Sequence, residues 1–158
     1  MALAPSALAS SLESTWLVAE GGAYPDSPSQ SGDKFATAVS GWFASATAGP
    51  FPCSTATARK SQLAASATGA IQAGDPSLAG AQLALGLMGY MAGQSFGAGV
   101  ASPPAAVSAA QSALTGAFSD LDSPLSARAN QMATGIYTLA VSTIVIFPPV
   151  ISPPTPVT

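Results

Sequence analysis

Few of the side chains that enzymes use for chemistry occur in this sequence. There is no histidine and only one cysteine, Cys53, so the chain cannot form a Ser-His or Cys-His pair or a zinc site of several thiolates. Three of the seven carboxylates, Asp26, Asp75 and Asp122, each stand just before a proline and are better explained as helix N-caps. The remaining four are Glu13, Glu20, Asp33 and Asp120. A glycosidase needs two carboxylates with separated pKa values, and the sequence shows no such pair.

One tetrapeptide matches a catalytic motif. Ser31-Gly32-Asp33-Lys34 spells S-x-x-K, but the S-D-N and K-T-G elements that accompany it in serine β-lactamases are absent. We therefore interpret Lys34 as a solvated residue near the start of a helix. The glycine-rich motifs that bind phosphates are also absent. We expect a protein that is not an enzyme, with no cofactor and no metal site.

The composition restricts the class of protein further. Of the 158 residues, 48% are hydrophobic and only 7% are charged, and the net charge is −3. This is too apolar for a disordered chain, and four basic residues are too few to neutralise the phosphates of a nucleic acid. The Met1–Pro5 start lacks the basic and apolar regions of a signal peptide, so we expect assembly in the cytoplasm that made it.

Three short segments that each contain Asp, Ser and Pro, here called marks, divide the chain into repeats. Asp26-Ser27-Pro28, Asp75-Pro76-Ser77 and Asp122-Ser123-Pro124 are 49 and 47 residues apart. A cap residue followed by proline is typical of a helix start. Large apolar residues follow each mark at helical spacing and align as Phe35/Val39/Trp42, Leu83/Leu87/Tyr90 and Met132/Ile136/Leu139. A second helical pattern precedes each mark, at Leu8–Trp16, Leu63–Ile71 and Val107–Phe118.

These patterns predict an all-α fold. Three degenerate helical hairpins, at about 1–52, 53–102 and 103–142, would form a single six-helix domain over residues 1–142. The breakers between them are Gly49–Pro52 and Gly97–Pro104. Residues 143–158 are β-branched and then proline-rich, which predicts an extended C-terminal arm.

The arm is the predicted partner-binding segment. Its candidate residues are Ile144, Ile146, Phe147, Pro148 and Pro149. No charged residue occurs from Ala129 onward, so nothing protects an exposed strand there. The arm could bind a neighbouring subunit, for example at the edge of its sheet, or it could fold back on its own bundle.

A membrane-active, holin-like protein is the alternative. Gly89-x-x-x-Gly93-x-x-x-Gly97 resembles a membrane helix-packing face, and residues 83–100 and 133–151 are the candidate spans. Polar residues and glycines in the first span and Pro148-Pro149 in the second disfavour it, and basic residues that would orient the spans are missing. We therefore do not expect a membrane partner.

Three segments of the sequence carry a resemblance to a known class of protein. They are the Met1-Ala2-Leu3 start, the F-A-x-A-[VI]-x-x-[WY]-like segment Phe35–Trp42 and the Phe147-Pro148-Pro149 ending. With them the chain resembles small structural proteins of tailed-bacteriophage virions. Such proteins lie in necks, tails, baseplates or on capsids. The resemblance implies a non-enzymatic assembly subunit of a large particle, with other protein subunits as partners and many copies in each assembly. It also implies location in a virion that assembles in the host cytoplasm. It carries over no site residues.

Overall fold

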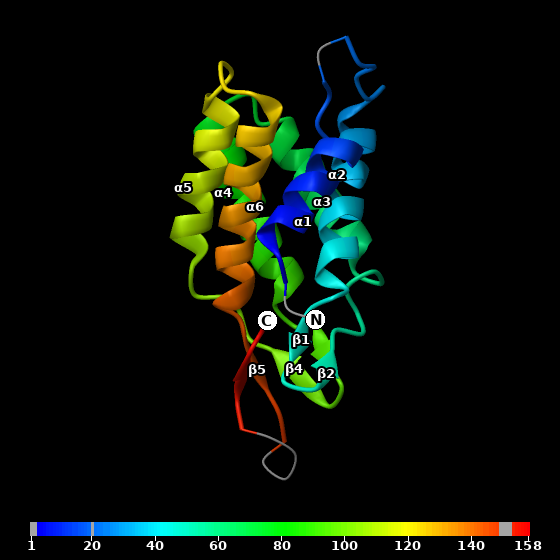
Figure 1. The fold of residues 1–158 in the computed structure, drawn as a ribbon, viewed down its shortest axis with the longest axis vertical. Coiled ribbons are helices and arrows are strands. Elements are labelled where there is room, and N and C mark those ends of the chain that lie inside the picture. The colour runs from blue at the N-terminus through cyan, green and yellow to red at the C-terminus, as the bar shows by residue number, and fades with distance from the viewer. Residues whose placement is uncertain (1–2, 20, 149–152) are drawn as a thin grey trace.

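The chain alternates pairs of helices with pairs of short strands. The computed structural model describes residues 3–19, 21–148 and 153–158. Over these residues the helices are α1 (Pro5–Thr15), α2 (Pro28–Phe43), α3 (Lys60–Ile71), α4 (Pro76–Met91), α5 (Val107–Ser119) and α6 (Leu125–Val141). The strands are β1 (Thr47–Ala48), β2 (Phe51–Pro52), β3 (Ser95–Phe96), β4 (Gly99–Ala101), β5 (Ile144–Ile146) and β6 (Thr155–Pro156). The order helix, helix, strand, strand thus occurs three times (Figure 1).

The expectation of an all-α fold is wrong, because the fold is mixed α/β. Helices account for 56% of it, and the strands form two small antiparallel sheets. Each strand has only two or three residues, which is too short for the alternating pattern that reveals a strand in a sequence. The predicted breakers at Gly49 and Gly97 are the turns of two strand pairs, and both glycines have positive φ, as tight hairpin turns favour.

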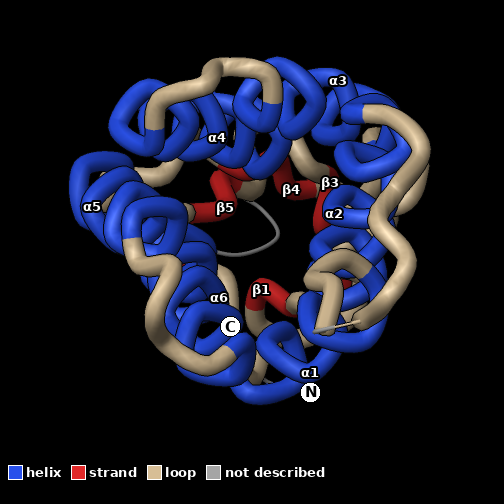
Figure 2. Tube along the Cα trace, turned by 90° about the horizontal axis from the view of Figure 1, so that it is seen from above, coloured by secondary structure: helices blue, strands red, loops and turns tan. Residues whose placement is uncertain are grey.

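The helices form a closed ring. Each helix packs against the next along the chain, and α6 packs against α1 to complete the circle (Figure 2). The predicted apolar face points into this ring, because its three triplets of large residues are all buried. They are Phe35, Val39 and Trp42 on α2, Leu83, Leu87 and Tyr90 on α4, and Met132, Ile136 and Leu139 on α6.

Two of the helix starts follow the predicted capping. Asp75 is the N-cap of α4, and its Oδ1 accepts a hydrogen bond of 2.9 Å from the backbone N of Leu78. At α2 the cap is Ser27 rather than Asp26. Asp122 is not a cap either, because α6 starts at Leu125 after Pro124 and has no side-chain cap. The capping prediction is confirmed for Asp75 and wrong for the other two carboxylates.

Glycines bring neighbouring helices into close contact. A Cβ built on Gly32 of α2 would lie 2.7 Å from the backbone O of Ala64 on α3. A Cβ built on Gly80 of α4 would lie 2.7 Å from the backbone N of Thr115 on α5. Both distances are too short for a real Cβ, so these two helix contacts require glycine.

The strands also form a closed ring, at one end of the helices. The same hydrogen bond closes each strand pair: Cys53 N to Ala46 O (2.9 Å), Ala101 N to Gln94 O (2.9 Å) and Val157 N to Thr143 O (3.0 Å). The residue after each of these donors forms a hydrogen bond that joins its strand pair to the next pair. These bonds are Ser54 N to Ser95 O (2.9 Å), Ser102 N to Ile144 O (2.8 Å) and Thr158 N to Thr47 O (2.9 Å). The predicted arm is therefore the third strand pair in this ring.

Candidate functional site

Among the residues that the structure describes, the S-x-x-K motif and the carboxylates do not come together as a catalytic group. Ser31 accepts a hydrogen bond of 2.9 Å from Trp16 Nε1, and Asp33 forms an ion pair of 2.9 Å with Lys60. Lys34 is half-buried on α2. In the part of the chain that the structure describes, no three carboxylate, cysteine or histidine side chains are placed to hold a metal.

A buried polar cluster joins the helices to the strands. Gln94 is fully buried, and its Oε1 accepts hydrogen bonds from Thr55 Oγ1 (2.6 Å) and Cys53 Sγ (3.7 Å), while its Nε2 donates to Tyr90 O (2.9 Å). Tyr90 donates its hydroxyl to the backbone O of Ala56 (2.8 Å). Burial raises the pKa of both the Cys53 thiol and the Tyr90 phenol. Both groups are therefore neutral near pH 7.

This cluster holds the chain in place. Among the described residues, no buried side-chain nitrogen or oxygen lacks a hydrogen-bond partner, so the cluster has no polar atom directed at a ligand. A buried, protonated thiol is also a poor nucleophile. We interpret Cys53, Thr55, Gln94 and Tyr90 as the link between the segment that follows β2 and the end of α4, which the sequence did not reveal.

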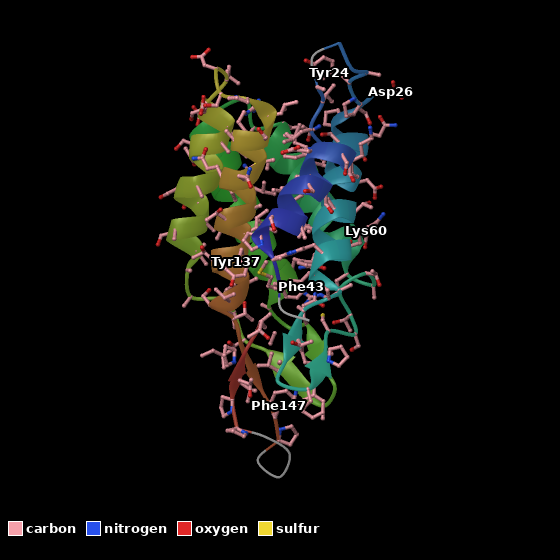
Figure 3. All side chains as sticks on the ribbon, in the orientation of Figure 1. Tyr24, Asp26, Phe43, Lys60, Tyr137 and Phe147 are labelled. Atoms are coloured by element: carbon pink, nitrogen blue, oxygen red, sulfur yellow. The ribbon has the colours of Figure 1, made fainter. Side chains whose placement is uncertain are left out.

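The end of the molecule formed by the strands, here called the strand end, contains no charged side chain of its own, although Arg59 borders it and donates a hydrogen bond to Ala92 O. It consists of residues 44–58, 92–106, 142–148 and 153–158, and none of them is Asp, Glu, Lys or Arg. The opposite end, here called the loop end, consists of the loops between the helices of each pair. It carries Asp26, Asp75, Asp120 and Asp122. Figure 3 shows Phe147 at the strand end, while Tyr24 and Asp26 lie at the loop end.

Three β-branched side chains are exposed together at the strand end. Val100 is 52% exposed, Ile144 47% and Ile146 57%. Val100 and Ile146 are cross-strand partners in β4 and β5, and Ile144 is on the same side of β5 because side chains alternate along a strand. The intervening Val145 is buried. We call Val100, Ile144 and Ile146 the β-face.

The predicted partner-binding residues divide into exposed and buried ones. Ile144, Ile146 and Pro148 are exposed. Phe147 is buried, and its ring lies 5.0 Å from that of Phe51. Pro149 lies outside the described residues. Val100 was missed by sequence reasoning, because only the pairing of β4 with β5 places it beside Ile146.

The backbone of the predicted arm pairs within its own chain. β5 pairs with β4 on one side and with β6 on the other. Thr47 and Thr158 exchange two backbone hydrogen bonds, each of 2.9 Å, so β6 is joined to β1. The arm thus pairs with other strands of its own chain rather than packing under the helical bundle, and Ile144 and Ile146 stay exposed. A partner would contact side chains of the β-face rather than add a strand here.

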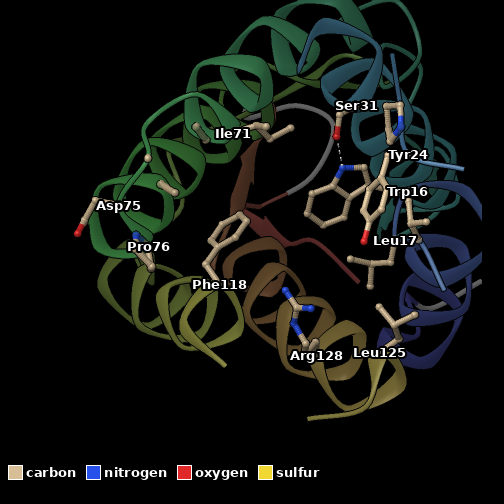
Figure 4. Close-up of a pocket in the computed structure, with 15 residues that line it drawn as sticks. Trp16, Leu17, Tyr24, Ser31, Ile71, Asp75, Pro76, Phe118, Leu125 and Arg128 are labelled. Atoms are coloured by element: carbon tan, nitrogen blue, oxygen red, sulfur yellow. Dashed lines mark hydrogen bonds between the residues drawn. The ribbon is translucent and has the colours of Figure 1, made fainter. Parts of the chain in front are cut away.

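A pocket of about 440 Å³ opens at the loop end, within the helical ring (Figure 4). Aromatic and aliphatic side chains from the ends of α1, α3 and α5 form its walls, with a small number of polar groups. The lining includes Trp16, Ile71, Phe118, Ser31, Ala79 and Arg128. This volume falls in the range of small-molecule sites, which are about 300–1,000 Å³.

Charge in this pocket comes from Arg128. Figure 4 shows its side chain extending toward the pocket, whereas the carboxylate of Asp75 points away from it. Arg128 Nε donates a hydrogen bond of 3.1 Å to the backbone O of Ala117. Sequence reasoning missed this pocket, although the repeat alignment contains a signal for it, described below.

The chain matches no protein family, no curated protein and no solved structure. Among the described residues, no helix has the length and apolar character that crossing a bilayer requires.

Proposed function

We propose that the protein is a non-enzymatic structural subunit of a large protein assembly, of the kind that forms necks, tails, baseplates or capsids of tailed-phage virions. Its partners are other protein subunits, including further copies of itself, and the assembly forms in the host cytoplasm. The observation that supports this best is the uncharged strand end with its exposed β-face.

The composition of the strand end is that of a protein–protein interface. The core of such an interface is depleted in charged residues, and grouped apolar side chains on a surface mark interaction sites. Exposed prolines also occur at the strand end, among them Pro52, Pro148 and Pro156, and Pro156 is the cross-strand partner of Ile144. These add apolar area without a charge that would have to lose its water on binding.

The closed strand ring suits repeated assembly. The outer edges of each strand pair are hydrogen-bonded to neighbouring pairs within the chain. This protects them from uncontrolled edge-to-edge pairing with other chains. Contact between subunits is then determined by side chains, which can be specific. A standard interface buries about 800 Å² on each partner, so the exposed prolines of the strand end must contribute along with the β-face.

Sedimentation velocity over a range of concentrations tests the proposal. We expect the wild-type protein to associate as its concentration rises and the Ile144→Thr/Ile146→Thr double variant to remain monomeric. Threonine keeps the β-branched shape that strands favour, so the thermal stability should barely change. Leu85→Gln is the matched control, because Leu85 is 55% exposed on α4, away from the strand end.

Two results would contradict the assembly role. The first is a wild-type protein that stays monomeric at every concentration. The second is an association that Leu85→Gln weakens as much as the double variant does, since the β-face would then have no special part in it.

A further inference from the structure

The pocket at the loop end contains a departure from the threefold repeat. Phe35, Leu83 and Met132 are equivalent core residues. The residues four positions before them, one helical turn nearer the pocket, are Ser31, Ala79 and Arg128, and all three line the pocket. Two repeats have a small side chain at this position. The third has a guanidinium group.

The walls of the pocket are held in place before any ligand binds. Trp16 donates its indole N–H to Ser31 Oγ at 2.9 Å. Its ring packs edge-on against Phe35 and Phe118, with centroid distances of 5.0 and 6.5 Å. Aromatic surfaces fixed in this way can bind a flat apolar group at little cost in conformational entropy.

The guanidinium of Arg128 is only partly satisfied. Its Nε bonds to Ala117 O, and no partner among the described residues accepts a hydrogen bond from Nη1 or Nη2. Asp120 contributes nearby negative charge: its pKa is lowered mainly by hydrogen bonds from Ser123 and, to a smaller extent, by the charge of Arg128. Asp120 is not among the residues that line the pocket. The two free amino groups of Arg128 therefore remain able to bind an anion in the planar, two-point manner typical of arginine.

We propose that this pocket binds a small organic carboxylate with a flat, apolar body of one or two rings. The carboxylate bonds to Nη1 and Nη2 of Arg128, and the rings lie among Trp16, Ile71 and Phe118. Fixed aromatic walls, a volume of about 440 Å³ and one inward-pointing cation carry this assignment together. It is independent of the assembly role, which concerns the opposite end of the molecule.

Two ligands of the same shape, one anionic and one neutral, test whether the pocket prefers the anion. The probes are 2-naphthoate and its neutral amide, 2-naphthamide, titrated into the full chain by isothermal calorimetry at neutral pH. A hydrogen bond to a charged group contributes about 1.5–3 kcal/mol, so we expect naphthoate to bind about tenfold to a hundredfold more tightly. Binding should also quench the tryptophan fluorescence, because Trp16 lines the pocket.

Variants of Arg128 assign the preference to one side chain. Arg128→Gln should bind the two probes with equal affinity, and Arg128→Lys should keep a preference for the anion. Lys34→Gln is the matched control, because it removes a positive charge from α2 outside the pocket and should change nothing. Circular dichroism of each variant checks that it is folded. If Arg128→Gln does not fold, the comparison of Arg128→Lys with the wild type still tests the role of this side chain.

Three results would overturn the proposal. These are no binding of naphthoate at millimolar concentration, equal affinity of the wild type for both probes, and a preference for the anion that persists in Arg128→Gln. A preference that disappears in Lys34→Gln would also overturn it, since the protein would then respond to its net charge rather than to Arg128.

Discussion

Replacing Tyr90 by phenylalanine isolates one buried hydrogen bond at the junction between helices and strands. The Tyr90 hydroxyl donates to Ala56 O at 2.8 Å, and the tyrosine side chain is fully buried. Tyr90→Phe removes the donor and leaves a buried carbonyl without this partner. Such a change costs about 1–2 kcal/mol of unfolding free energy, which lowers the Tm by about 2–8 °C in a chain of this length.

The chain offers a matched control for this change. Tyr137 of α6 is half-buried, and no hydrogen bond of its hydroxyl is found among the described residues. Tyr137→Phe should therefore change the unfolding free energy by less than about 0.5 kcal/mol. Urea denaturation followed by circular dichroism measures both variants, provided that the m-value is unchanged.

The same variant predicts the behaviour at high pH. Burial raises the pKa of Tyr90 in the folded protein above its model-peptide value of 10.0. The folded state then holds this proton more tightly than the unfolded state, so the contribution to stability is complete below about pH 10 and is lost as the pH rises above it. Burial acts on Cys53 in the same direction, from a value of 9.0.

We therefore expect the wild type to lose stability more steeply than Tyr90→Phe above about pH 10. The gap between their unfolding free energies should narrow as the pH rises. If Tyr90→Phe is as stable as the wild type at pH 7, or if Tyr137→Phe costs as much, the hydroxyl contributes nothing through Ala56 and the reasoning is refuted.

Other predictions concern packing, capping and ring closure. Trp42→Ala should lower the unfolding free energy by about 3–5 kcal/mol in urea titrations, because its ring is buried inside the helical ring. Asp75→Ala should cost about 0.5–2 kcal/mol through loss of the α4 cap, and an unchanged Tm would contradict this. Gly80→Ala should lower the unfolding free energy by about 1–3 kcal/mol through overpacking. Gly41→Ala, with open space around its Cβ, should raise it by about 0.5–1 kcal/mol. Scanning calorimetry of the two variants tests these opposite signs. Deleting the chain after Val141 should abolish cooperative thermal unfolding, because the third strand pair would be missing, and a stable truncated protein would show that the strand ring is dispensable.

The helices could be predicted because their apolar residues recur with the helical period over several turns. The triplets on α2, α4 and α6 survive as buried layers even though the amino acids differ between repeats, for example Phe35, Leu83 and Met132. The start of α6 was predicted within a few residues, but its cap was not, because Pro124 takes the cap position without a side-chain acceptor. Local sequence signals are reliable only where the cap itself forms the bond.

The strands could not be predicted because their hydrogen-bonding partners are distant in the sequence. Thr47 pairs with Thr158, and Cys53 with Phe96, whereas two residues of extended chain have no recognisable pattern of their own. The β-face has the same origin, since Val100 and Ile146 are neighbours only through that pairing. The pocket residue Arg128 could have been noticed from the repeat alignment, as the charged member of a set whose other members are Ser31 and Ala79.

The closure of both rings has a consequence for how the protein is synthesised. α1 packs between α2 and α6, and β1 pairs with the segment that follows β6, so the first and last parts of the chain meet along one seam. On the ribosome, the first two repeats can form their own helix contacts early. β1 lacks its last partner until residues 155–158 have emerged, and α1 lacks its second neighbour until α6 has emerged. A nascent chain halted before that point would expose apolar residues of α1 to solvent and to other nascent chains. The delay between making α1 and making α6 is thus the interval in which these apolar residues are most open to wrong contacts.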